Sequence, residues 1–198
     1  MNNTQNTDQL AQAITKALGY TENGGKPDPK QTKAGASGEL KSIFQFTPDT
    51  WKKDSQQVLG SSDIPLTPDS ETAVVLGKVK NWLSQGKTVQ QIASMWNAGE
   101  GEPDAYTGKF STGKESVGTN DHGVKYSVPD YVSKVTNYTK EFLLDNAHKT
   151  VAQSSNQKQI VNNLLSIIQN APGKQQVAQN TVPSTNPGLV KLPISTAS

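Results

Sequence analysis

The chain has 198 residues, a formal net charge of +2 and no cysteine. This length suits one domain with an appendage, and the low hydrophobic (32%) and aromatic (6%) fractions indicate that part of the chain lies outside a packed core. The lysines are scattered, which excludes the basic stripe of a nucleic-acid binder, and the missing cysteines exclude disulfides and thiolate metal sites.

The N-terminal stretch MNNTQNTDQL lacks the basic cluster and apolar run of a secretory signal, and no stretch is long enough to span a bilayer. We therefore expect no membrane span and no signal peptide in this sequence. Two routes of delivery stay open. Either the protein is delivered without a signal peptide, for instance in a phage particle or through a holin, or a leader has been removed before residue 1.

A first helix is predicted by apolar residues at helical spacing, namely Leu10, Ile14, Ala17 and Leu18. Asn6 and Gln9 have the spacing of a capping box, so the helix should begin at Asn6. It should end near residues 19–20, or one turn later at Glu22, because Gly and Pro breakers follow. Glu22 therefore lies where a helix meets a long loop.

Three short helices are predicted after an ambiguous segment, 38–46, which suits either a strand or a buried helical turn. Their start signals are Thr47-Pro48-Asp49, Thr67-Pro68-Asp69 and Thr88 with Gln91 three residues on. The aromatic residues Trp51 and Trp82 on these helices have the core as their default position.

Residues 97–126 lack periodicity and read as a long surface loop that could contain a hairpin. Ser127-Val128-Pro129-Asp130 then opens another helix, with Pro in its first turn. One face of that helix carries Tyr131, Val135, Tyr138 and Phe142.

The composition changes after Asn146, and this change sets three predicted units. Residues 1–146 form the main domain, 147–172 an amphipathic C-terminal helix, and 173–198 a disordered tail or linker rich in Pro, Ser, Thr and Asn. The helix is either a strut packed on the domain or, like the tail, a docking site for a protein partner.

Four blocks of this sequence resemble the soluble lytic transglycosylase domain of the lysozyme-like superfamily, which is related to goose-type lysozyme. They are Glu22 at a helix end, Ser42-Ile43-Phe44-Gln45, Met95-Trp96-Asn97-Ala98-Gly99, and Tyr131-Val132-Ser133-Lys134-Val135. Their order and approximate spacing match over roughly residues 8–144. The resemblance implies a mainly α, lysozyme-like fold with a small irregular or β element.

The resemblance also implies roles for single residues. Glu22 matches the catalytic glutamate, although Asn23 follows it where most members have Ser, and Ser42 replaces a family Gly. The loop between Glu22 and Gln45 is longer than is typical. Trp96 stands where a Tyr is usual. The implied substrate-binding residues are Phe44, Gln45, Trp96, Asn97 and Tyr131.

The function implied by the resemblance is cleavage of the β-1,4 bond between MurNAc and GlcNAc in peptidoglycan, with 1,6-anhydromuramyl products. One glutamate suffices, because it first protonates the leaving oxygen and then, as a base, takes the proton of the muramic acid 6-hydroxyl. No cofactor or metal is needed. Such an enzyme acts on glycan strands at the cell wall, whether periplasmic, extracellular or virion-associated.

Two other functions stay open. A hydrolytic lysozyme on the same fold would need a second acid, such as Glu39, Asp49 or Asp54, to position water. A non-catalytic wall-binding component of a virion or secretion apparatus would keep the fold without the chemistry. Intact Glu22, Gln45 and Asn97 argue against that loss.

Each candidate has a plainer interpretation. Gln45 and Asn97 could cap backbone groups, Tyr131 could be half core, and Glu39 an exposed loop charge. Metal sites are not predicted, because Glu100, Glu102 and Asp104 lack the spacing of a calcium loop, and His122 and His148 are isolated.

Overall fold

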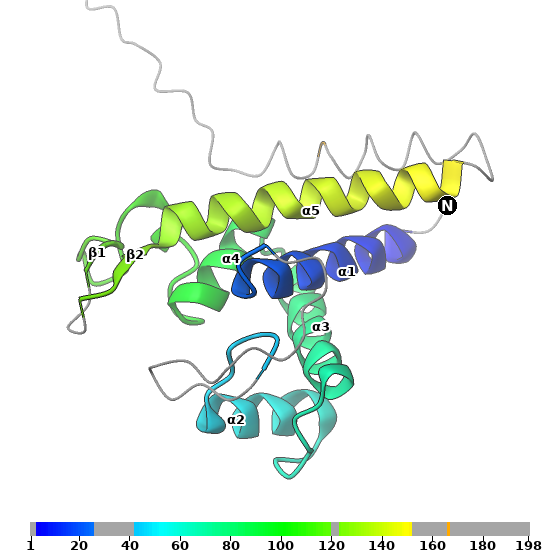
Figure 1. The fold of residues 1–198 in the computed structure, drawn as a ribbon, viewed down its shortest axis with the longest axis horizontal. Coiled ribbons are helices and arrows are strands. Elements are labelled where there is room, and N and C mark those ends of the chain that lie inside the picture. Colours follow the sequence, from blue (N-terminus) through cyan, green and yellow to red (C-terminus); the bar gives the residue numbers. More distant parts are fainter. Residues whose placement is uncertain (1–2, 26–41, 120–122, 152–165, 167–198) are drawn as a thin grey trace, which may run out of the picture.

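The computed structural model describes residues 3–25, 42–119, 123–151 and 166. Its elements are α1 (Asn3–Glu22), α2 (Pro48–Leu59), α3 (Pro68–Ser84), α4 (Val89–Ala98), the 3-10 helix η1 (Ala105–Thr107), β1 (Val117–Thr119), β2 (Lys125–Ser127) and α5 (Val128–Val151), as Figure 1 shows. The predicted mainly helical chain with a small β element is therefore confirmed. Glu39, His122 and the expected tail lie outside the described residues. Of the expected C-terminal helix (147–172), residues 147–151 are the end of α5, Ser166 is described, and the rest lies outside the described residues. No described helix could cross a membrane.

The threonine start signals are confirmed for the middle three helices. Thr47, Thr67 and Thr88 are the N-caps of α2, α3 and α4, and each side chain accepts a hydrogen bond from the backbone amide three residues on. In α4 the Gln91 side chain also bonds back to the cap amide, which completes the predicted capping box. These bonds satisfy amide groups that have no partner within the helix itself.

The predicted start of the first helix is wrong. α1 begins at Asn3, so Asn6 lies inside the helix and is not its N-cap. Asn is only mildly unfavourable within a helix, so the capping pattern did not require the chain to begin its helix there. The helix ends at Glu22, the later of the two predicted ends.

α1 and α5 lie side by side, and α3 runs away from α1 toward α2 at the other end of the molecule (Figure 1). The core between α1, α3, α4 and α5 contains fully buried side chains from all four helices, among them Ile14, Leu18, Val75, Val79, Ile92 and Val135. Trp51 and Trp82 are only 5% and 4% exposed, so their predicted place in the core is confirmed.

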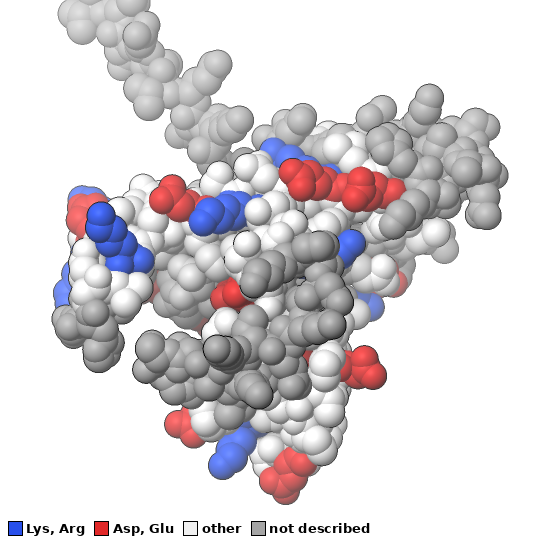
Figure 2. Space-filling model, in the orientation of Figure 1, with Lys and Arg blue, Asp and Glu red and all other residues white. Residues whose placement is uncertain are grey.

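The segments between the helices differ from one another. Residues 42–47 form neither strand nor helix, so neither predicted option is right for the described part, 42–46, of the segment 38–46; residues 38–41 lie outside the described residues. Within 97–126, β1 and β2 pair as an antiparallel hairpin in which Val117 lies opposite Ser127. On the face drawn in Figure 2 the charged side chains of both signs are interspersed, as the scattered lysines of the sequence suggest.

Candidate active site

The C-terminal end of α1 is fastened to the segment 42–46. The buried Asn23 side-chain amide donates to the backbone oxygen of Gly19 at 2.7 Å and to that of Ile43 at 2.9 Å. Gly19 permits the close approach, because a Cβ at this position would lie 3.1 Å from Ile43 Cγ2 and from Phe44 Cε1. Glu22, the last residue of α1, is thereby held beside this segment.

The Glu22 carboxylate receives two hydrogen bonds on the same oxygen. Trp96 Nε1, from α4, donates to Glu22 Oε1 at 3.2 Å, and the Tyr131 hydroxyl, from α5, donates to it at 2.5 Å. These donors lie 74 and 109 residues further along the chain. Residues from three of the four sequence blocks therefore meet around one carboxylate.

Tyr131 remains a donor over a wide pH range. Burial raises the pKa of its phenol well above the usual value of 10, and the negative charge of Glu22 and the hydrogen bond to it raise it further. The phenol therefore stays protonated at neutral pH and keeps its hydrogen on Glu22.

For the peptidoglycan cleavage that the resemblance implies, we predict that Tyr131→Phe lowers kcat about 10-fold to 100-fold while the variant still folds. A hydrogen bond to a charged group contributes roughly 1.5–3 kcal/mol, and this one holds the carboxylate in place. Steady-state kinetics on peptidoglycan would measure the loss. Tyr126→Phe, at an exposed hydroxyl of the hairpin, is the matched control and should leave kcat unchanged. Equal activity in the two variants would contradict the role of Tyr131.

Trp96, which donates to Glu22, belongs to a cluster of packed aromatic rings. The half-buried Trp96 ring packs edge-on against Phe44 and Phe46, with centroids 6.1 and 5.6 Å apart, and Phe46 packs against Trp51 at 5.2 Å. Phe44 is only 5% exposed. Its ring makes edge contacts with Trp96 and Phe46, and its predicted contact with substrate stays a prediction.

Gln45 and Asn97 differ in their settings. Gln45 is the single non-glycine residue with a positive φ in the described ranges, at 58°. This left-handed conformation costs roughly 1–2 kcal/mol for an L-residue, and such strain concentrates at functional sites. Asn97 is exposed near the end of α4, next to Trp96.

Glu71 on α3 is a residue that the sequence reasoning missed. Its side chain is fully buried, and Oε2 accepts a hydrogen bond from the Ile43 amide at 2.6 Å. An acidic residue in the first turn of a helix is normally interpreted as a partner of the helix dipole. The available signal was its spacing from Val74, Val75 and Lys78, which places it on the buried face of α3.

We predict that Glu71 makes folding stability depend on pH. Burial raises the pKa of its carboxyl above 4.5, although hydrogen bonds from the Ile43 amide, the Ser42 hydroxyl and the Phe44 amide act in the opposite direction. Because the folded-state pKa is raised, the folded state binds the proton more tightly than the unfolded chain does. The free energy of unfolding should therefore fall as pH rises from 4.5 through the folded pKa, with a limiting slope of about 1.4 kcal/mol for each pH unit.

Urea unfolding of the wild type and of Glu71→Gln between pH 4 and pH 8 would measure this effect. As pH rises across that window, the free energy of unfolding of the wild type should fall relative to that of Glu71→Gln. A difference that is independent of pH would show that Glu71 does not carry the effect.

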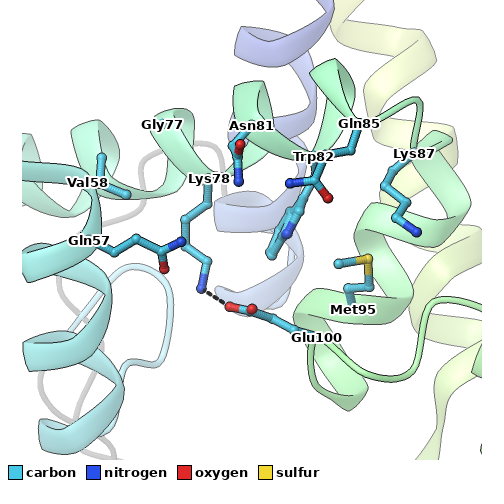
Figure 3. Close-up of a pocket in the computed structure, with 10 residues that line it drawn as sticks. All are labelled: Gln57, Val58, Gly77, Lys78, Asn81, Trp82, Gln85, Lys87, Met95 and Glu100. Carbon is cyan, nitrogen blue, oxygen red and sulfur yellow. Dashed lines mark hydrogen bonds and ion pairs between the residues drawn. The ribbon is translucent and has the colours of Figure 1, made fainter.

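A cavity of about 650 Å³, which Lys78 and Glu100 line and Glu22 does not, lies between α2, α3 and the end of α4 (Figure 3). Lys78 Nζ lies 2.6 Å from Asp54 Oδ2 and 2.8 Å from Glu100 Oε1. The hydrogen bond from Lys78 lowers the pKa of Glu100. None of the predicted site residues lines this cavity.

The remaining acidic candidates have other partners. Asp49 is exposed in the first turn of α2. Glu102 accepts hydrogen bonds from the Ser111 amide and hydroxyl, and Asp104 accepts one from the Gln91 side chain. Within the described residues no three His, Cys, Asp or Glu side chains gather as a metal site would require.

Comparisons with known proteins were made at three levels. No protein-family model, no curated protein and no solved structure matches the chain. The function proposed below therefore rests on the residues around Glu22.

Proposed function

We propose that this chain is a peptidoglycan lytic transglycosylase of lysozyme-like fold, which cleaves the β-1,4 bond between MurNAc and GlcNAc. The observation that supports the proposal is the meeting of Trp96 and Tyr131 at one oxygen of Glu22. These residues were selected from the sequence as separate blocks, and a chance resemblance gives no reason for their side chains to converge.

The first chemical step uses Glu22 as a general acid. Its protonated carboxyl gives a proton to the glycosidic oxygen as the bond from MurNAc C1 to that oxygen breaks, and positive charge develops on the MurNAc ring. The two donors on Oε1 keep the carboxyl group in one orientation during the transfer. The GlcNAc end of the strand then leaves with a free 4-hydroxyl.

The second step uses the resulting Glu22 carboxylate as a base. It takes the proton from the 6-hydroxyl of MurNAc as O6 bonds to C1, which closes the 1,6-anhydro ring and returns Glu22 to its protonated form. No water is consumed and no second carboxylate takes part. Hydrogen bonds from Trp96 and Tyr131 stabilise the ionised form of Glu22 between the steps.

The hydrolytic alternative is less well supported by the described acids. Asp54 is 1% exposed and bound to Lys78, and Asp49 lies in solvent on the first turn of α2. Neither has a hydrogen bond to any residue of the Glu22 site within the described residues. A general base that activates water must lie within hydrogen-bond reach of that water, next to the reacting sugar.

The proposed place of action is the cell wall, reached in the periplasm, outside the cell or from a virion. The substrate is the glycan strand, and Gln45 and Asn97 are its proposed contacts beside Trp96. The lysozyme-like fold and these contacts belong to the proposal.

Mass spectrometry of the muropeptides released from purified peptidoglycan tests this function. A transglycosylase releases anhydromuramyl ends, which are lighter by one water than the reducing ends left by a hydrolase. Reducing ends would replace the proposal with a lysozyme, and no release from several wall types would favour the non-catalytic component.

A further inference from the structure

The turn at residues 42–46 is irregular, and side chains hold its backbone. The Ser42 hydroxyl oxygen accepts from the Phe44 and Phe46 amides at 3.0 and 3.1 Å. Glu71 binds the Ile43 amide, and Asn23 binds the Ile43 carbonyl. Gln45, with its positive φ, lies within this turn. The conformation of the turn is therefore set by surrounding groups and not by a helix or strand.

The Ser42 bonds and the Glu71 bond act differently. Ser42 is part of the turn, so its bonds can form in this short segment alone. Glu71 belongs to α3, 28 residues from Ile43, so its bond fixes where the turn lies relative to the core. A carboxylate with 0% exposure carries a large desolvation cost, which an apolar side chain at this position would avoid. What the carboxylate supplies is a rigid acceptor for the turn's backbone.

The turn is linked to Glu22 through aromatic rings. Phe44 and Phe46, on either side of Gln45, both pack against Trp96. Trp96 Nε1 donates to Glu22 Oε1. A displacement of the turn would therefore move the indole relative to the carboxylate.

We infer that Glu71 is a positioning residue of the Glu22 site, which anchors the turn 42–46 and through Phe44 and Phe46 sets the place of Trp96 against Glu22. The effect on catalysis rests on the proposed function. The effect on the indole of Trp96 does not, because it is a property of the folded protein.

The first test follows the indole signals of the three tryptophans by ¹⁵N–¹H NMR on the full chain at neutral pH, assigned with Trp96→Phe. Glu71→Leu fills the same buried position but leaves the Ile43 amide without its acceptor. The Trp96 signal should move in this variant. The Trp82 signal should stay, because its ring lies against Lys78 and has no ring contact with Phe44 or Phe46 in the described residues.

Asp54→Asn is the matched control, since it also neutralises a buried carboxylate but lies in the Lys78 cluster. It should lower stability without moving the Trp96 signal. Should Glu71→Leu fail to fold, Ser42→Ala weakens the same turn with a smaller change and should also move the signal. An unmoved Trp96 signal in the folded variant would overturn the inference.

The second test measures kinetics with peptidoglycan as substrate. In Glu71→Leu we expect kcat to fall about 10-fold to 100-fold with KM within about twofold, because misplacing a catalytic contact by about 1 Å has an effect of this size. A purely structural role would lower stability and leave kcat of the folded fraction unchanged. That result would also overturn the inference, whereas a wild type without activity would instead count against the proposed function and leave the NMR test decisive.

Discussion

Glu22→Gln should lower the rate of peptidoglycan cleavage at least about 10³-fold. The amide can neither give a proton to the glycosidic oxygen nor take one from the 6-hydroxyl, so both steps lose their proton carrier, and general acid–base catalysis contributes roughly 10²–10⁴-fold in each role. The fold should survive, because the amide oxygen can still accept hydrogen bonds from Trp96 Nε1 and the Tyr131 hydroxyl. The release of soluble muropeptides, followed over time, measures the rate.

The control for this variant is Glu115→Gln, which changes an exposed glutamate of the hairpin region in the same way. It should cleave like the wild type. Melting temperatures of both variants should lie within a few degrees of the wild-type value. Cleavage by Glu22→Gln at the wild-type rate would remove Glu22 as the acid and would return attention to the other carboxylates.

Lys78→Met should lower the free energy of unfolding by about 3–5 kcal/mol. Lys78 and Asp54 are almost completely buried, with side chains 8% and 1% exposed, and their charged atoms lie 2.6 Å apart. Removing the lysine leaves the Asp54 carboxylate buried without its cation, and the loss of one partner of a buried pair has this magnitude. Glu100, which is 42% exposed, would be solvated by water and would add little.

The double variant Asp54→Asn, Lys78→Met separates the unpaired charge from the lost packing. With neither charge present, the double variant should be more stable than Lys78→Met alone, and urea unfolding at pH 7 measures all three proteins. Such recovery is expected only if the unpaired carboxylate is the main cause. A double variant as unstable as the single one would instead attribute the loss to packing against Trp82, whose ring centroid lies 5.2 Å from Lys78 Nζ.

The first helix shows how the sequence could mislead. Asn6 and Gln9 fit a capping box, yet α1 begins at Asn3. Thr47, Thr67 and Thr88 fit the same kind of pattern and do cap their helices. Two of these threonines precede a proline, which favours the first turn of a helix. Thr88 has no such proline and still caps α4, so the capping-box pattern by itself succeeded there and failed at Asn6.

The site was predictable only in part. Glu22, Trp96 and Tyr131 were selected from the sequence by resemblance, and they meet in the structure. Glu71 was not selected, because an acidic residue after Thr-Pro-Asp looks like an exposed charge at the beginning of a helix. Its spacing from Val74, Val75 and Lys78 places it on the buried face of α3, but its partner, the Ile43 amide, comes from the packing of α3 on the turn at 42–46.

By itself the sequence determined features that close within a few residues, namely the N-caps of α2 to α4, since hydrogen bonds to neighbouring amides decide them. Only the tertiary structure decided which side chains share a site. The bonds that join Glu22 to Trp96 and Tyr131 span 74 and 109 residues. Such contacts depend on how whole helices pack, and the positive φ of Gln45 is sustained by the same packing.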